Sequence, residues 1–144
     1  MTDSYFPAGK STITVVDDDP GLVTLVRVML EEKEFNLRYA YSGSQLLADL
    51  EEQKPDLIIL DIMMRQMAVH EVLTRLKENP SSASIPIILL TEHEDILGEY
   101  KIAADEYIMK PFTRTQLMRS INRFLSGDRG TSVLPDSISP GSFR

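Results

Sequence analysis

Residues 56–64, DLIILDIMM, place an aspartate at the end of an uninterrupted apolar run. A short run rich in Leu and Ile is typical of a strand that helices cover on both faces of a parallel sheet. The carboxylate of Asp61 would lose hydration at such a strand end, so it would need a compensating partner. The stretch therefore predicts a buried strand and, at its carboxyl end, a chemically demanding position.

Similar apolar runs flank this stretch, and segments with apolar residues at helical spacing separate them. The predicted strands are residues 13–16, 35–41, 57–60, 85–90 and 107–109. Strict alternation of strands and helices predicts an α/β fold, a doubly wound five-stranded parallel sheet with five helices. Residues 35–39 alternate between apolar and polar, which indicates a strand nearer an edge of the sheet.

Helix boundaries are also legible in the sequence. Asp19 is a candidate N-cap with Pro20 at the first helical position, and Ser42 can cap the second helix. The third helix should end near residues 79–80, because the residue before a proline disfavours the helical conformation. A short fourth helix containing Gly98 is expected around residues 95–102, and a fifth begins at Thr113.

Length and composition indicate one globular domain with a flexible tail. The 144 residues are 42% hydrophobic and 26% charged, an ordinary profile for a folded domain. We expect residues 11–125 to form this domain, after a short extension at 1–10. Residues 126–144 are rich in Gly, Ser and Pro without apolar periodicity, which is typical of a tail or linker.

Charge and cysteine content limit the class of protein. A formal net charge of −7 argues against binding of the nucleic-acid backbone as the main activity. The chain contains no cysteine and no apolar run long enough to cross a bilayer, and it begins without a signal-peptide pattern. We therefore expect a cytoplasmic protein without direct contacts to membrane or nucleic acid.

Polar side chains follow four of the predicted strands. The positions are Asp17, Asp18 and Asp19 after the first, Asp61 after the third, Thr91 after the fourth and Lys110 after the fifth. In doubly wound sheets these ends converge where ligands bind. Taken singly, Asp19 reads as a helix cap, Thr91 as the start of a capping box and Lys110 as a turn lysine. Together they indicate one site.

The chemistry of this set indicates phosphoryl transfer to an aspartate. Clustered carboxylates repel one another, so they require cations. Lys110 supplies one, and Mg²⁺, which binds one or two carboxylates and keeps waters and phosphate oxygens in its shell, is the natural second. A carboxylate nucleophile, a metal ion, a hydroxyl donor and an ammonium group suit an aspartyl-phosphate reaction.

Four motifs in this order resemble the response-regulator receiver domain of two-component signalling: ITVVDDDP (13–20), DLIILDIMM (56–64), IPIILLT (85–91) and YIMKPF (107–112). The resemblance covers about residues 11–125 and implies a flavodoxin-like receiver fold. It implies that Asp61 accepts the phosphoryl group and that Asp17, Asp18, Asp61 and the backbone carbonyl of Met63 bind Mg²⁺. By the same resemblance, Thr91 is the switch hydroxyl, Lys110 contacts the phosphoryl group, and Tyr107 is the switch aromatic. The Lys110–Pro111 bond is expected to be cis.

The resemblance implies a phosphorylation-dependent signalling switch. A histidine kinase or a histidine phosphotransfer protein would donate the phosphoryl group to Asp61, and the chain would catalyse only its own phosphorylation and dephosphorylation. The downstream protein partner is not identified by the sequence. The resemblance also allows a homodimer through the face formed by the fourth helix, the fifth strand and the fifth helix.

The chain departs from the family pattern in two places. After Asp61, residues Arg65, Ala68 and Val69 stand where the family usually has Pro and an Asp-Gly pair, and Glu92 replaces a small residue after Thr91. These departures leave open a phosphorylation-independent interaction module. A Mg²⁺-dependent phosphatase with an aspartyl intermediate is a further alternative, although such enzymes commonly carry a second Asp where this chain has Met63.

Overall fold

The computed structural model describes residues 10–30, 34–62, 69–92 and 104–125. Within these ranges the chain forms a five-stranded parallel sheet and four helices. The elements are β1 (Thr12–Val16), α1 (Pro20–Leu30), β2 (Asn36–Ala40), α2 (Gly43–Leu50), β3 (Leu57–Asp61), α3 (Val69–Glu78), β4 (Ile87–Thr91), β5 (Glu106–Met109) and α4 (Arg114–Leu125). Met63, the helix expected at 95–102 and the tail at 126–144 lie outside the described residues.

The strand order is β2-β1-β3-β4-β5, and every neighbouring pair is parallel. The predicted doubly wound sheet is therefore confirmed, and β2 lies at an edge as its alternating pattern indicated. The fourth strand begins at Ile87 rather than at residue 85. Pro86 has no N–H to give to the ladder, although its carbonyl accepts a hydrogen bond from the Ile58 N–H at 3.0 Å.

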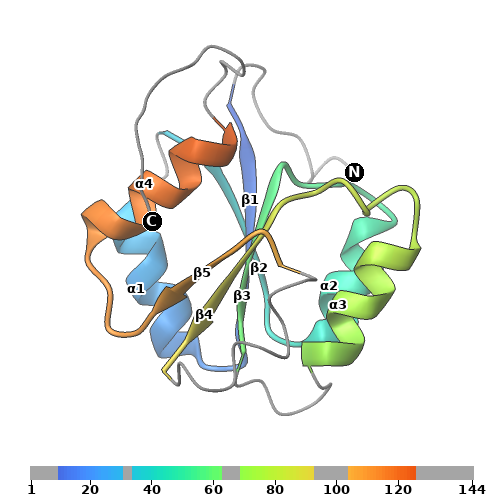
Figure 1. The fold of residues 1–144 in the computed structure, drawn as a ribbon, viewed down its shortest axis with the longest axis horizontal. Coiled ribbons are helices and arrows are strands. Elements are labelled where there is room, and N and C mark those ends of the chain that lie inside the picture. The colour runs from blue at the N-terminus through green and yellow to red at the C-terminus, as the bar shows by residue number, and fades with distance from the viewer. Residues whose placement is uncertain (1–9, 31–33, 63–68, 93–103, 126–144) are drawn as a thin grey trace.

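Helices cover both faces of the sheet, with α1 and α4 on one face and α2 and α3 on the other (Figure 1). Alternate residues of β3 point to opposite faces, so Ile59 packs with α1 and α4 while Ile58 packs with α2 and α3. Each face thus has its own buried apolar layer. This double burial explains why β3 consists of an uninterrupted apolar run.

The helix starts follow the predicted capping chemistry. The Asp19 carboxylate accepts a hydrogen bond from the Gly21 N–H at 2.9 Å, and the Ser42 hydroxyl accepts one from the Gln45 N–H at 3.0 Å. Before α4, the Thr113 hydroxyl accepts from the Gln116 N–H at 3.1 Å. These caps satisfy N–H groups that have no partner within the helix.

Candidate functional site

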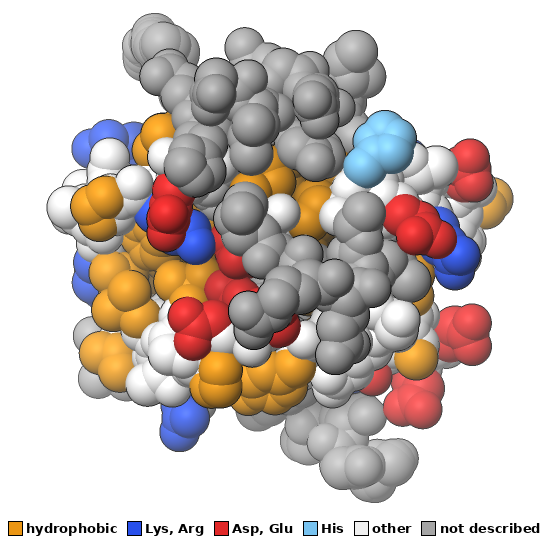
Figure 2. Space-filling model, turned by 90° about the horizontal axis from the view of Figure 1, so that it is seen from below, with side chains coloured by type: hydrophobic (Ala, Val, Ile, Leu, Met, Phe, Trp, Pro, Cys, Tyr) orange, Lys and Arg blue, Asp and Glu red, His pale blue; other side chains and the backbone are white. Residues whose placement is uncertain are grey.

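The predicted site residues meet at the carboxyl edge of the sheet. Asp17 follows β1, Asp61 ends β3, and Lys110 follows β5. A cavity of about 330 Å³ opens here, lined by Asp17, Asp18, Asp19, Pro20, Asp61, Glu92 and Lys110. Seen from this edge, acidic side chains gather near the middle of the molecular face (Figure 2). The topology therefore brings together side chains that are far apart in the sequence.

An ion pair joins Asp61 and Lys110 at the centre of the site. The Lys110 Nζ lies 2.9 Å from Asp61 Oδ1, and the side chains are 17% and 5% exposed, respectively. The two atoms are close, but within the described residues Asp61 Oδ1 accepts no bond of hydrogen-bonding geometry. The Lys110 N–H donates to the Thr91 carbonyl at 2.6 Å, which fixes the lysine backbone beside the end of β4. Lys110 is thus the compensating cation that a buried Asp61 requires.

Asp17 is buried beside this pair. Its Oδ1 accepts a hydrogen bond from the Asp19 N–H at 3.0 Å, whereas Oδ2 has no hydrogen-bond partner in the described part of the chain. Burial raises the pKa of Asp17 to about 7, and the negative charges of Asp61 and Asp18 also raise it. The Asp19 N–H and the Lys110 ammonium oppose this rise. The site therefore holds more carboxylates than its own cation can stabilise.

The predicted switch residues occupy the neighbouring strands. Thr91 is the last residue of β4 and is fully buried. Tyr107 lies on β5 opposite Leu89 and is 37% exposed. The peptide bond between Lys110 and Pro111 is cis, as the resemblance implied. Thr91 and Lys110 therefore lie at adjoining strand ends. Tyr107 lies two residues before Met109, the residue of β5 that pairs with Thr91.

Glu92 makes a contact that the sequence did not reveal. Its Oε2 lies 4.0 Å from Lys110 Nζ, and its side chain is 60% exposed. Lys110 thus lies between a buried carboxylate and an exposed one, with Asp61 on the inner side. The sequence placed the Glu92 carboxylate near the mouth of the site, and the cavity lining agrees with that position, but its contact with Lys110 depends on how β4 and β5 pair.

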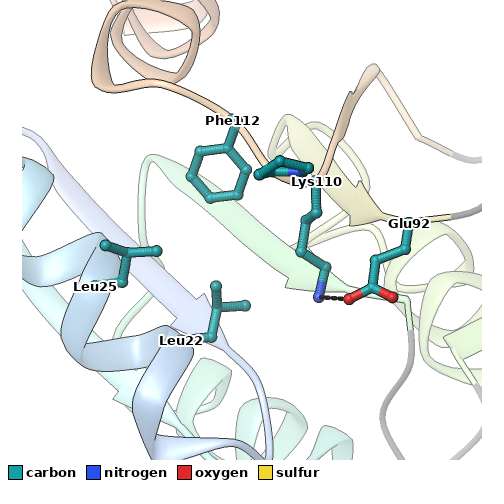
Figure 3. Close-up of a pocket in the computed structure, with 6 residues that line it drawn as sticks. Leu22, Leu25, Glu92, Lys110 and Phe112 are labelled. Atoms are coloured by element: carbon teal, nitrogen blue, oxygen red, sulfur yellow. Dashed lines mark ion pairs between the residues drawn. The ribbon is translucent and has the colours of Figure 1, made fainter.

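A second, apolar cavity of about 450 Å³ adjoins the acidic one. Leu22, Leu25, Glu92, Lys110, Pro111 and Phe112 line it, and Figure 3 shows Phe112 facing the two leucines of α1. It shares Lys110 and Glu92 with the acidic cavity. Leu22 is partly buried, whereas Leu25 is an exposed apolar residue of the same helix. An exposed leucine hints at an apolar surface on α1, but it does not show that Phe112 and Pro111 complete a cavity there.

Comparison with known proteins identifies the family. Residues 13–122 match the family model of the response regulator receiver domain. The chain is 35% identical over 117 residues to the phosphate regulon transcriptional regulatory protein PhoB of Rhizobium meliloti, covering 78% of this chain and 51% of that protein. It is 32% identical over 126 residues to the probable transcriptional regulatory protein TcrX of Mycobacterium tuberculosis, covering 85% of this chain and 53% of that protein. The chain belongs to the receiver-domain family of two-component response regulators.

Solved structures agree with this assignment. The response regulator TrrA of Thermotoga maritima, determined in complex with Mg²⁺ and BeF, has a TM-score of 0.72 and 30% identity, covering 80% of this chain and 99% of that chain.

The chain spans about half the length of the curated relatives it matches. None of the helices in the described residues is long and apolar enough to cross a membrane.

The oxygen atoms of the site fit a hard divalent cation. Asp17 Oδ2 and Asp61 Oδ1 are buried and accept no hydrogen bond within the described residues, and carboxylate oxygens are ligands that Mg²⁺ prefers. Among the same residues no group of three acidic or histidine side chains is arranged to hold a metal ion. The ligand set of Asp17, Asp18, Asp61 and the Met63 carbonyl therefore stays a prediction from the family resemblance, and Mg²⁺ commonly takes only one or two carboxylates and keeps several waters.

Proposed function

We propose that this receiver domain is a phosphorylation-dependent switch in which Asp61 accepts a phosphoryl group from a phosphohistidine. The observation that carries the proposal is the buried Asp61–Lys110 ion pair, with its 2.9 Å separation, beside Asp17, whose Oδ2 has no hydrogen-bond partner within the described ranges. A buried carboxylate can attack a phosphoryl group. The adjacent ammonium, and a cation bound by the second carboxylate, can compensate the charge of the phosphoryl oxygens.

In the proposed transfer, an Asp61 carboxylate oxygen attacks phosphorus as the phosphorus–nitrogen bond of the phosphohistidine breaks. The imidazole leaves as a neutral ring that keeps the proton on its other nitrogen. Asp17 and Asp18, with Asp61 and the Met63 carbonyl, would hold Mg²⁺, which neutralises phosphoryl oxygens when bound. Lys110 follows the charge from the carboxylate to the new phosphoryl oxygen, so it stays paired throughout.

The output of the switch would start at Thr91. Its hydroxyl belongs to the strand end next to Lys110, so a phosphoryl oxygen on Asp61 would attract it. Movement of Thr91 would free space for the partly exposed Tyr107 ring and change the surface around β5. A free-energy difference of a few kcal/mol between the two arrangements is enough to shift the population.

The apolar cavity supplies a place for the phosphodonor protein. Because this cavity shares Lys110 and Glu92 with the acidic one, a protein that presents a phosphohistidine to Asp61 must cover it. Leu22, Leu25 and Phe112 would then become buried, which contributes about 25 cal/mol per Å² of apolar surface removed from water. We infer that a histidine kinase or a histidine phosphotransfer protein docks here.

The test is phosphorylation followed by intact mass measurement. The chain is incubated with phosphoramidate, with and without Mg²⁺, and should gain one phosphoryl group only with the metal. Asp61→Asn should gain none, whereas the matched variant Asp49→Asn on α2 should behave as the wild type. Mass gain by Asp61→Asn would contradict the assignment of Asp61. A folded wild type that gains no mass would instead favour a phosphorylation-independent interaction module.

A further inference from the structure

Glu92 lines both cavities beside Lys110. Figure 3 shows its carboxylate beside the Lys110 ammonium, and the Glu92 side chain is 60% exposed. The inner side of the same ammonium contacts Asp61 at 2.9 Å, against 4.0 Å for Glu92. Glu92 is therefore the outer of two carboxylates that share one cation.

The charge balance of the acidic cavity makes this placement consequential. Within the described residues five carboxyl groups and a single ammonium line the cavity. An anionic donor that approaches Asp61 meets this negative field, and Glu92 lies at its solvent side. Glu92 also competes with the incoming phosphoryl oxygens for Lys110, the cation that would otherwise attract them.

We propose that Glu92 is a specificity-determining residue that discriminates between phosphodonors by their charge. It disfavours small dianionic acyl phosphates and leaves phosphorylation to donors that carry less charge or that gain binding energy from other contacts. A phosphohistidine protein gains such contacts from the adjoining apolar cavity, lined by Leu22, Leu25 and Phe112. The inference rests on the proposed function of Asp61 and adds the choice of substrate.

Two small phosphodonors differ in net charge but react with Asp61 by the same displacement at phosphorus. Acetyl phosphate is a dianion at neutral pH, and its phosphorus–oxygen bond breaks as acetate leaves with the electron pair. Phosphoramidate carries a single net negative charge in its zwitterionic form, and its phosphorus–nitrogen bond breaks as ammonia leaves with the electron pair. In both reactions an Asp61 oxygen forms the new bond to phosphorus, so the acceptor chemistry is the same.

The experiment measures second-order rate constants of phosphorylation by intact mass, with saturating Mg²⁺ and each donor in turn. Glu92→Gln should accelerate acetyl phosphate about three- to tenfold more than phosphoramidate, the factor expected for one added unit of donor charge near a removed carboxylate. Glu92→Lys should enlarge this difference. Because mobile ions screen exposed charges, the difference should shrink in 1 M salt.

The matched control is Glu78→Gln, which removes an exposed carboxylate from the last turn of α3 and changes the net charge equally. It should leave both rates unchanged. Equal acceleration of both donors by Glu92→Gln, no acceleration, or the same selectivity change in Glu78→Gln would overturn the role of Glu92. If neither donor phosphorylates the wild type, the proposed function of Asp61 fails, and this inference fails with it.

Discussion

At the scale of single residues, the site is a balance between buried carboxylates and one ammonium group. Asp61 ends β3 and Asp17 follows the neighbouring strand β1, and both side chains are almost inaccessible to solvent. Only Lys110 forms an ion pair with this inner group among the described residues, and it also contacts Glu92. The unphosphorylated site therefore stores repulsion that a metal ion or a proton can relieve.

Removal of Lys110 should lower the free energy of unfolding. Lys110→Met leaves Asp61 buried without its cation, so we expect a loss of about 2–4 kcal/mol, toward the lower end of the range for broken buried pairs because Lys110 is partly exposed. The double variant Asp61→Asn with Lys110→Met should recover most of that loss. Urea unfolding at pH 7 without metal measures both, and additive losses in the double variant would contradict the coupling.

Asp17 should make the metal-free protein less stable as the pH rises toward neutrality. Its pKa is about 7 in the folded chain, against the ordinary value of 3.8 that applies to an aspartate in the unfolded chain. The folded state therefore binds this proton more tightly, and the stabilisation it gives is complete below about pH 4 and is lost as the pH approaches 7. The urea midpoint should fall between pH 5 and pH 7 in the wild type and fall less in Asp17→Asn. An identical pH profile for the two proteins would contradict the raised pKa.

At the scale of elements, the connection between β5 and α4 holds Lys110 in place from both sides. On the β5 side, the Lys110 N–H donates to the Thr91 carbonyl at the end of β4. After it, Thr113 caps α4, and the Arg114 Nε donates to the Met29 carbonyl near the end of α1 at 2.7 Å. The segment that carries the site lysine is thus tied to a strand and to two helices.

Loss of the α4 cap should weaken this segment. Thr113→Ala removes the hydroxyl that accepts the Gln116 N–H, so we expect a loss of about 1 kcal/mol in the free energy of unfolding. Thr115→Ala is the control, because Thr115 is exposed in the first turn of the same helix and alanine favours helix. Thermal unfolding of the two variants checks this, and equal loss in both would show that the cap does not stabilise α4.

The elements also show what the sequence could and could not predict. The sheet, the edge position of β2 and the caps at Asp19 and Ser42 were predictable because each depends on a local pattern. The Asp61–Lys110 meeting was predictable because parallel strands end at one edge. The contact of Glu92 with Lys110 and the apolar cavity beside Leu25 were not, since both depend on how side chains from separate elements pack after the sheet has formed.

At the scale of the whole molecule, ligand binding and folding should be linked through the carboxyl edge of the sheet. Asp17 directly follows β1 and Asp61 ends β3, so an ion held between them binds only the folded chain. Mg²⁺ at ten times its dissociation constant should add about 1.4 kcal/mol to the free energy of unfolding, a rise of about 3–6 °C in Tm. Asp18→Ala should show much less of this rise, whereas Glu78→Ala should keep it. Equal shifts in wild type and Asp18→Ala would place the ion elsewhere.

Because the two apolar layers lie on opposite faces of the sheet, one side of the molecule can be labelled without disturbing the other. In the part of the chain that the structure describes, the layer under α2 and α3 shares the sheet but no helix with the layer under α1 and α4. A spectroscopic label on the outward side of α2 or α3 therefore reports on the fold without touching the surface beside Lys110 where the phosphodonor is proposed to dock. The same separation would let the α2–α3 side change in sequence while the proposed phosphorylation site stays intact.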